Sequence, residues 1–158
     1  MNFMKKAALL LGFVLLFSMM AGCQMSRTPV DADTFKTKAE AAGYTVNETT
    51  NVYPDGADGD CLLAIKNPDA IEYQIEFVIL STTEQAKKLY QEKYSEYESK
   101  KGISSSHSSV SVGNYSYYHL TTNGKYYVVS RTENTFLFVA TSETYKNEIS
   151  DFLGSIGY

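Results

Sequence analysis

The stretch IEYQIEFVIL, residues 71–80, decides the fold predicted for this chain. Every second residue in it is large and apolar, and these residues are Ile71, Tyr73, Ile75, Phe77 and Ile79. Glu72, Gln74 and Glu76 stand between the first four of them, and Val78 stands between the last two. Because side chains alternate between the two faces of a strand, the pattern predicts a β-strand with one face in the core and the other at least partly in water.

A long helix is predicted directly after this strand, over residues 81–101. Ser81 and Glu84 have the spacing of a capping box at its start, and Gly102 ends it. Its apolar residues recur at helical spacing and are rich in tyrosine: Ala86, Leu89, Tyr90, Tyr94 and Tyr97. Such a stripe suits a helix that lies on a sheet and keeps its phenol hydroxyl groups near water.

Similar patterns extend in both directions along the chain. A helix capped by Asp31 is predicted over residues 30–44, and another begins at Ser142. Further strands are predicted at residues 44–49, 61–66, 110–121, 126–131 and 135–141. Asn123-Gly124 favours a type I′ hairpin turn, whereas the serine-rich residues 102–109 indicate a flexible loop.

These elements predict an α+β fold in the order α-βββ-α-βββ-α. Consecutive antiparallel strands with interspersed helices suit a two-layer sandwich, in which a sheet of about five to six strands carries its helices on one face. Residues 31–158 are enough for one such domain and too few for two ordinary ones.

The first 22 residues have the pattern of an export signal. Lys5 and Lys6 precede 16 residues without a charge, residues 7–22. A helix needs about 20 residues to span a bilayer core of roughly 30 Å, so this stretch is short for a permanent span. We therefore expect a cleaved signal peptide over residues 1–22.

Residues Met20-Ala21-Gly22-Cys23 resemble the lipobox of bacterial lipoproteins, with Met20 standing where that family usually has leucine. The resemblance implies that the chain is cut before Cys23 and that the Cys23 thiol receives a diacylglycerol with palmitate-type acyl chains. As a whole, the chain resembles small exported lipoproteins of Gram-positive bacteria that carry an α+β domain. This resemblance implies a protein anchored by lipid at the extracytoplasmic face of the cell membrane.

Two other interpretations of this segment stay open. It could be an uncleaved anchor helix, or an ordinary secretory signal with an incidental cysteine. Under the lipoprotein interpretation, residues 23–30 hold the acylated cysteine and a short polar tether. Seven extended residues reach at most about 25 Å, so the domain is expected close to the lipid headgroups.

Charge and cysteine content exclude some functions. Without Lys5 and Lys6, 12 basic residues face 18 acidic ones, a net charge of −6. Such a protein is a poor partner for nucleic acid, and an anionic membrane does not attract it by charge. The remaining cysteine, Cys61, has no second thiol to pair with once Cys23 is acylated, so it is interpreted as a small buried residue.

Three carboxylates on the glycine-rich loop over residues 51–60 could bind a hard cation such as Ca²⁺: Asp55, Asp58 and Asp60. The loop lacks the alternating spacing and the closing glutamate of an EF-hand. A solvated hairpin loop is therefore the favoured interpretation, and no cofactor is predicted.

Tyrosines on the strands around Asn123-Gly124 are the second candidate site. Those that face outward could form a flat aromatic platform for a glycan or a peptide, and Tyr118 and Tyr127 are the candidates. The alternative is that they cover a small core. His107 and His119 lack the spacing of a zinc site.

The sequence therefore predicts a membrane-anchored binding module of the cell envelope, with an envelope protein or a wall glycan as its partner. It is not expected to be an enzyme, since no catalytic motif is present. Two alternatives are an envelope enzyme that uses the loop carboxylates with His107 and a passive structural lipoprotein.

Overall fold

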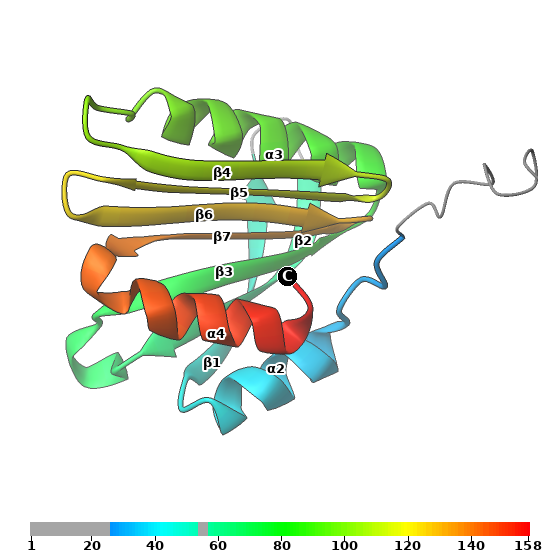
Figure 1. Ribbon diagram of the computed structural model, residues 1–158. Coiled ribbons are helices and arrows are strands. Elements are labelled where there is room, and N and C mark those ends of the chain that lie inside the picture. The colour runs from blue at the N-terminus through cyan, green and yellow to red at the C-terminus, as the bar shows by residue number, and fades with distance from the viewer. Residues whose placement is uncertain (1–25, 54–56) are drawn as a thin grey trace, which may run out of the picture.

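A computed structural model describes residues 26–53 and 57–158 of the chain. Its centre is one seven-stranded, fully antiparallel sheet with strand order β1-β2-β3-β7-β6-β5-β4 (Figure 1). The strands are β1 (Thr45–Tyr53), β2 (Ala57–Lys66), β3 (Tyr73–Leu80), β4 (Ser106–Val112), β5 (Tyr115–Thr122), β6 (Lys125–Thr132) and β7 (Thr135–Ser142). The helices are α2 (Ala32–Ala41), α3 (Thr83–Glu98) and α4 (Lys146–Ile156), with short 3-10 turns η2 (Pro68–Ala70) and η3 (Glu143–Tyr145).

The predicted α+β class is confirmed, but the predicted strand count and order are wrong. The described elements follow the order α-βββ-α-ββββ-α. Residues 110–121, predicted as one strand, belong to β4 and β5, which meet at Gly113 with a φ of 57°. The first half of β4 lies in residues 102–109, which were predicted as a flexible loop.

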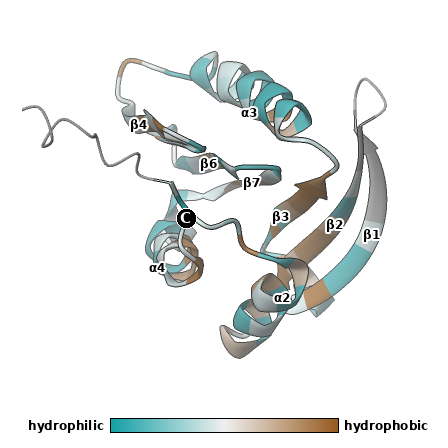
Figure 2. Cartoon of the chain, turned by 90° about the vertical axis from the view of Figure 1, so that its right-hand side faces the viewer, coloured by the Kyte–Doolittle hydropathy of each residue, from teal (hydrophilic) through white to brown (hydrophobic). Residues whose placement is uncertain are grey.

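The prediction that all helices lie on one face is also wrong. Phe77 and Val78 are both fully buried, although neighbouring residues of a strand point to opposite faces. Phe77 packs in a cluster with α2 and α4, whereas Val78 packs in a second cluster with α3. Helices therefore cover both faces of the sheet, as Figure 2 shows.

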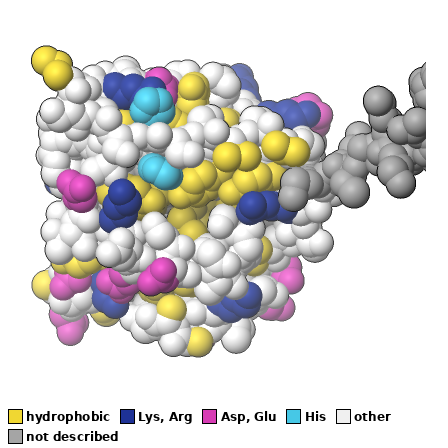
Figure 3. Space-filling model, in the orientation of Figure 1, with side chains coloured by type: hydrophobic (Ala, Val, Ile, Leu, Met, Phe, Trp, Pro, Cys, Tyr) yellow, Lys and Arg dark blue, Asp and Glu magenta, His cyan; other side chains and the backbone are white. Residues whose placement is uncertain are grey.

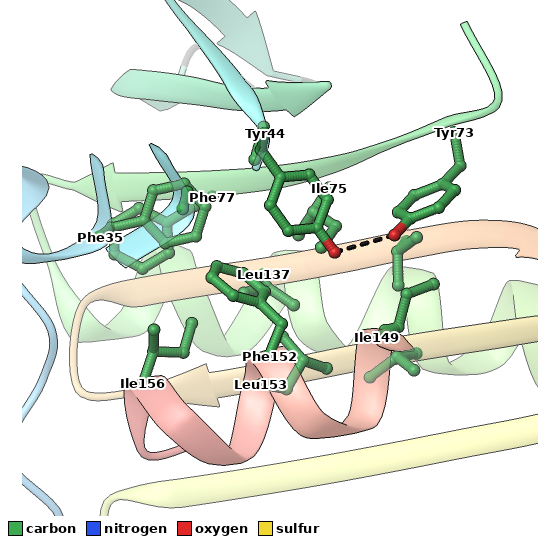
Figure 4. Close-up of a cluster of buried hydrophobic side chains, with 14 of the residues drawn as sticks. Phe35, Tyr44, Tyr73, Ile75, Phe77, Leu137, Ile149, Phe152, Leu153 and Ile156 are labelled. Atoms are coloured by element: carbon green, nitrogen blue, oxygen red, sulfur yellow. Dashed lines mark hydrogen bonds between the residues drawn. The ribbon is translucent and has the colours of Figure 1, made fainter. Parts of the chain in front are cut away.

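The core under α2 and α4 combines packed aromatic rings with aliphatic side chains (Figure 4). The Phe35 ring of α2 stacks on Phe77 of β3 with centroids 4.4 Å apart. The hydroxyl groups of Tyr44 and Tyr73 are hydrogen-bonded at 2.8 Å, so both buried phenols are satisfied. This core uses the alternating face predicted for residues 71–80, except for Ile71, which precedes β3 and is 61% exposed.

The core under α3 holds the predicted tyrosine stripe. Leu89, Tyr90 and Tyr97 are buried on this helix, as are its sheet partners Val129 and Phe136. The helix begins one residue later than predicted, because the capping box is formed by Thr82 and Gln85 rather than by Ser81 and Glu84.

The helices leave one part of the sheet uncovered. On the face that carries α4, contacts of α2 and α4 reach β1, β2, β3, β6 and β7. Tyr117 of β5 packs against the edge of the same core, and β4, at the far end of the sheet, extends beyond it. Among residues 26–53 and 57–158, no helix is both long enough and apolar enough to cross a bilayer.

Candidate functional site

Strand β4 is an open edge of the sheet. It pairs with β5 along seven residues, has no strand on its other side within the described sheet, and is exposed at every residue. Its sequence, SHSSVSV, contains no proline and no Asp, Glu, Lys or Arg. Natural proteins commonly protect edges with charges, prolines, bulges or covering segments, so β4 is accessible to a further strand.

An apolar and aromatic strip continues from this edge onto β5. We define the β4–β5 strip as Val110, Val112, Tyr115, Tyr117 and His119. The register pairs Val110 with Tyr117 and Val112 with Tyr115, so these side chains share one face. Val110 is 42% exposed and Val112 is 44% exposed, and hydrophobic side chains gather on this face above α4 (Figure 3).

The rings of the strip pack against one another. Tyr115 and Tyr117 are stacked, with centroids 6.4 Å apart, and His119 meets Tyr117 edge-on at 5.8 Å. Burial raises the pKa of Tyr117 and lowers the pKa of His119, with Lys146 and His107 also lowering the latter. The lowered pKa favours the neutral imidazole, so the strip carries no formal charge of its own near pH 7.

Arg27 closes one end of the strip. Its guanidinium carbon lies 3.5 Å from the centroid of the Tyr115 ring, the geometry of a cation–π contact. Burial raises the pKa of the Tyr115 phenol, and Arg27 partly offsets that rise. Lys146 lies 5.8 Å from the centroid of Tyr126, which neighbours His119, so cations lie near both ends of the strip.

The two tyrosines predicted as an exposed platform do not form one. Tyr118 is fully buried and meets Tyr94 of α3 edge-on, with centroids 4.9 Å apart. Tyr127 is half-buried and packs against Tyr97 at 4.9 Å. Both lie on the face that α3 covers. The predicted platform on Tyr118 and Tyr127 is therefore wrong, and the accessible ring on these strands is that of Tyr117.

The predicted metal and catalytic candidates do not converge. Asp55 and the side chain of Asp58 lie outside the described residues, and Asp60 is exposed on β2. His107 is exposed on β4, five strand spacings away in the sheet order, or about 24 Å. Within residues 26–53 and 57–158, no three His, Cys, Asp or Glu side chains are placed to hold a metal ion. Asp60 and His107 therefore do not form the common site that the enzyme alternative requires.

A pocket of about 460 Å³ lies between α2, β1 and β2. Its wall includes Asp33, Asp60 and an ion pair in which Lys36 Nζ lies 2.6 Å from Glu48 Oε1. The ion pair holds the pKa of the Glu48 carboxyl low and that of Lys36 high. Lys36 and Glu48 are solvent-exposed and held in their charged forms by this pair, so neither is poised as a general acid or base.

Comparison with known proteins does not identify a family. No protein-family model and no curated protein matches the sequence. The chain is similar to a solved structure described as a GTP binding regulator from Thermotoga maritima, with 18% identity and a TM-score of 0.45 over 78% of this chain and 84% of that one. A likeness this weak indicates no function.

The β4–β5 strip was not predicted from the sequence, and the reason is physical. The strand 110–121 was predicted without its turn at Gly113, and the role of Arg27 depends on contacts between residues far apart in the chain. The alternation of Tyr115, Tyr117 and His119 was visible, but only the position of α3 decides which face stays open.

Proposed function

We propose that this protein is a lipid-anchored binding module at the extracytoplasmic face of the cell membrane. The lipobox resemblance at Cys23 supports the anchor. The fold sets how close to that anchor the domain would sit, since Ser26 and Arg27 contact Asn114 and only Gln24 and Met25 stand between Cys23 and Ser26. A lipid on Cys23 would thus hold the domain at the membrane surface.

The open β4 edge is the observation that carries the binding function. An extended peptide can add to such an edge, because the backbone N–H and C=O groups on that side supply regular hydrogen bonds. Val110 offers an apolar contact to a side chain of the added strand. An extended segment of an envelope protein therefore fits this edge better than a wall glycan, which lacks a peptide backbone.

The mass of the membrane-extracted protein tests the anchor. We expect a chain that begins at Cys23, lacks residues 1–22 and carries the added mass of a diacylglyceryl group with its acyl chains. Intact-protein mass spectrometry measures both changes at once. A chain that keeps residues 1–22, or that begins at Cys23 without added lipid, would contradict the anchor.

Val110→Lys is expected to weaken partner binding at β4. Val110 is 42% exposed, so covering it contributes on the order of 1 kcal/mol. Lysine removes that contribution and places a charge on the edge, which should lower binding at least about fivefold. The measurement is the yield of a photo-cross-link from Ser109 in intact cells.

Ile103→Lys is the matched control for this experiment. Ile103 is fully exposed in the turn before β4 and lies outside the strand, so the substitution introduces the same charge without touching the edge. Its cross-link yield should equal that of the unchanged protein. Equal cross-link yields from the two variants would contradict strand addition. A cross-link to glycan alone would show that the partner is a wall glycan and not a protein.

A further inference from the structure

The chain is fixed to one corner of the sheet from Ser26 onward. Asn114, in the β4–β5 turn, clamps the backbone of Arg27: its Oδ1 accepts from the Arg27 N–H at 2.9 Å, and its Nδ2 donates to the Arg27 carbonyl at 2.8 Å. The same Nδ2 donates to Glu133 Oε1 at 2.6 Å, which ties the clamp to the β6–β7 turn.

The Arg27 side chain fixes the same corner from the other direction. Its guanidinium donates to the carbonyl of Gly157 at 2.8 Å, just after α4, and lies over Tyr115 at the start of β5. The position of Arg27 is therefore set by the ends of two strands and one helix. We call Arg27, Asn114, Glu133 and Gly157 the Arg27 corner.

The tether between this corner and the anchor is very short. Cys23 precedes Ser26 by three residues, which span at most about 11 Å when fully extended. A diacylglyceryl group on Cys23 would place its glycerol backbone at the depth of the headgroups, so the Arg27 corner would be held at or within that layer.

We infer that the domain stands on the bilayer on its Arg27 corner, with Val112 in contact with the lipid interface and β4 and β5 rising away from the membrane. This orientation rests on the proposed anchor at Cys23. The partner that covers this surface is the bilayer in which the lipid anchor is embedded. The contact lies in the region between its headgroups and its acyl chains.

The chemistry of the corner suits that region. Val112 is 44% exposed at the end of β4 that adjoins Asn114. Arginine side chains are favoured where apolar groups meet polar headgroups, and Arg27 is exposed at this corner, where its guanidinium lies over the buried Tyr115 ring. Among the described residues, three other large apolar side chains are exposed: Val110 adjoins Val112 on β4, whereas Ile71 and Ile103 lie near the opposite end of the sheet. That end of β4 is about 20 Å from Val112.

The orientation also gives the binding edge a direction. Strand β4 would start at Ser106 far from the bilayer and end at Val112 beside it. A partner segment added to this edge would run roughly along the membrane normal. The bilayer would therefore limit how far that segment extends past Val112, whereas its other end, beside Ser106, would be unobstructed.

Tryptophan fluorescence can test this orientation, because the chain contains no tryptophan. Residues 23–158 would be coupled through Cys23 to a maleimide lipid in phosphatidylcholine–phosphatidylglycerol vesicles. All contacts described above lie within residues 26–158, and Cys61 is buried and protected from coupling. Val112→Trp reports on the Arg27 corner, and Ile71→Trp is the matched control at the far end.

We expect brominated lipids to quench Val112→Trp at least about twofold and vesicles to shift its emission to shorter wavelength, as for a residue in the interface. Ile71→Trp should change in neither respect. Val110→Trp, two residues further from the turn, should be quenched to an intermediate extent. The extent of quenching should therefore fall in the order Val112→Trp, Val110→Trp, Ile71→Trp. If one of these variants folds poorly, the other two still test the orientation.

Equal quenching of the Val112→Trp and Ile71→Trp variants, or no quenching of either, would overturn the orientation. A short-wavelength emission of Val112→Trp that appears without vesicles and grows with protein concentration would identify a second copy of the chain as the occupant instead. Because the lipid is attached chemically, these outcomes do not depend on acylation in cells. Failure of the mass measurement would overturn the anchor and leave this result standing as a property of the tethered domain.

Discussion

Cys23→Ala is expected to release nearly all of the protein from the membrane fraction. Two acyl chains anchor a protein stably, because each buried methylene contributes about 0.8 kcal/mol, whereas without acyl chains the acidic domain has no comparable attachment. The net charge of −6 after removal of the signal disfavours attraction to anionic lipid. Fractionation of cells followed by immunoblotting measures the distribution.

Cys61→Ala is the matched control for this release. Cys61 is 1% exposed in the core under α3, so its thiol is shielded by the fold. This variant should stay with the membrane, although its stability should fall by about 1 kcal/mol. A Cys23→Ala protein that remains in the membrane would favour the uncleaved anchor helix. Unchanged protein that appears free in the medium would favour an ordinary secretory signal.

Phe77→Ala is expected to lower the free energy of unfolding by about 3–5 kcal/mol. Phe77 is fully buried, stacks on Phe35 at 4.4 Å and meets Tyr158 edge-on at 6.3 Å. The substitution leaves a cavity between α2, α4 and the sheet. Domains of this size have a free energy of unfolding of about 5–15 kcal/mol, so the substitution would remove a large part of it.

Urea denaturation followed by circular dichroism measures this loss. Ile71→Ala is the matched control, since Ile71 belongs to the same alternating pattern but is 61% exposed. Its effect should stay within about 0.5 kcal/mol. A loss below about 1 kcal/mol for Phe77→Ala would show that the ring is not packed as described.

Residues with a strong local signal were predicted correctly. The alternation at Tyr73, Ile75 and Phe77 identified β3 and its buried face, and the Asn123-Gly124 turn has the two positive φ angles, 50° and 71°, that a type I′ turn requires. Asp31 caps α2 as expected, with its carboxylate accepting from the Thr34 N–H. These features depend on neighbours in the chain.

Residues whose structure depends on distant partners were not predicted. Strand β4 is rich in serine, which has little intrinsic preference for strands, and it forms because β5 offers a complete ladder of partners. The choice between Tyr117 and Tyr118 as the accessible tyrosine is decided by α3, which packs over Tyr118. Arg27 is hydrogen-bonded to Asn114, 87 positions away in the chain, and to Gly157, 130 positions away. No local sequence pattern predicts contacts over such separations.

The hydrogen bond from Arg27 to Gly157 brings both ends of the folded chain to one place. A fusion protein or affinity tag added after Tyr158 would therefore emerge beside the tether and compete with it for space. The Asn123-Gly124 turn lies at the other end of the strands and is exposed, which makes it the better insertion point for a fluorescent reporter or an epitope.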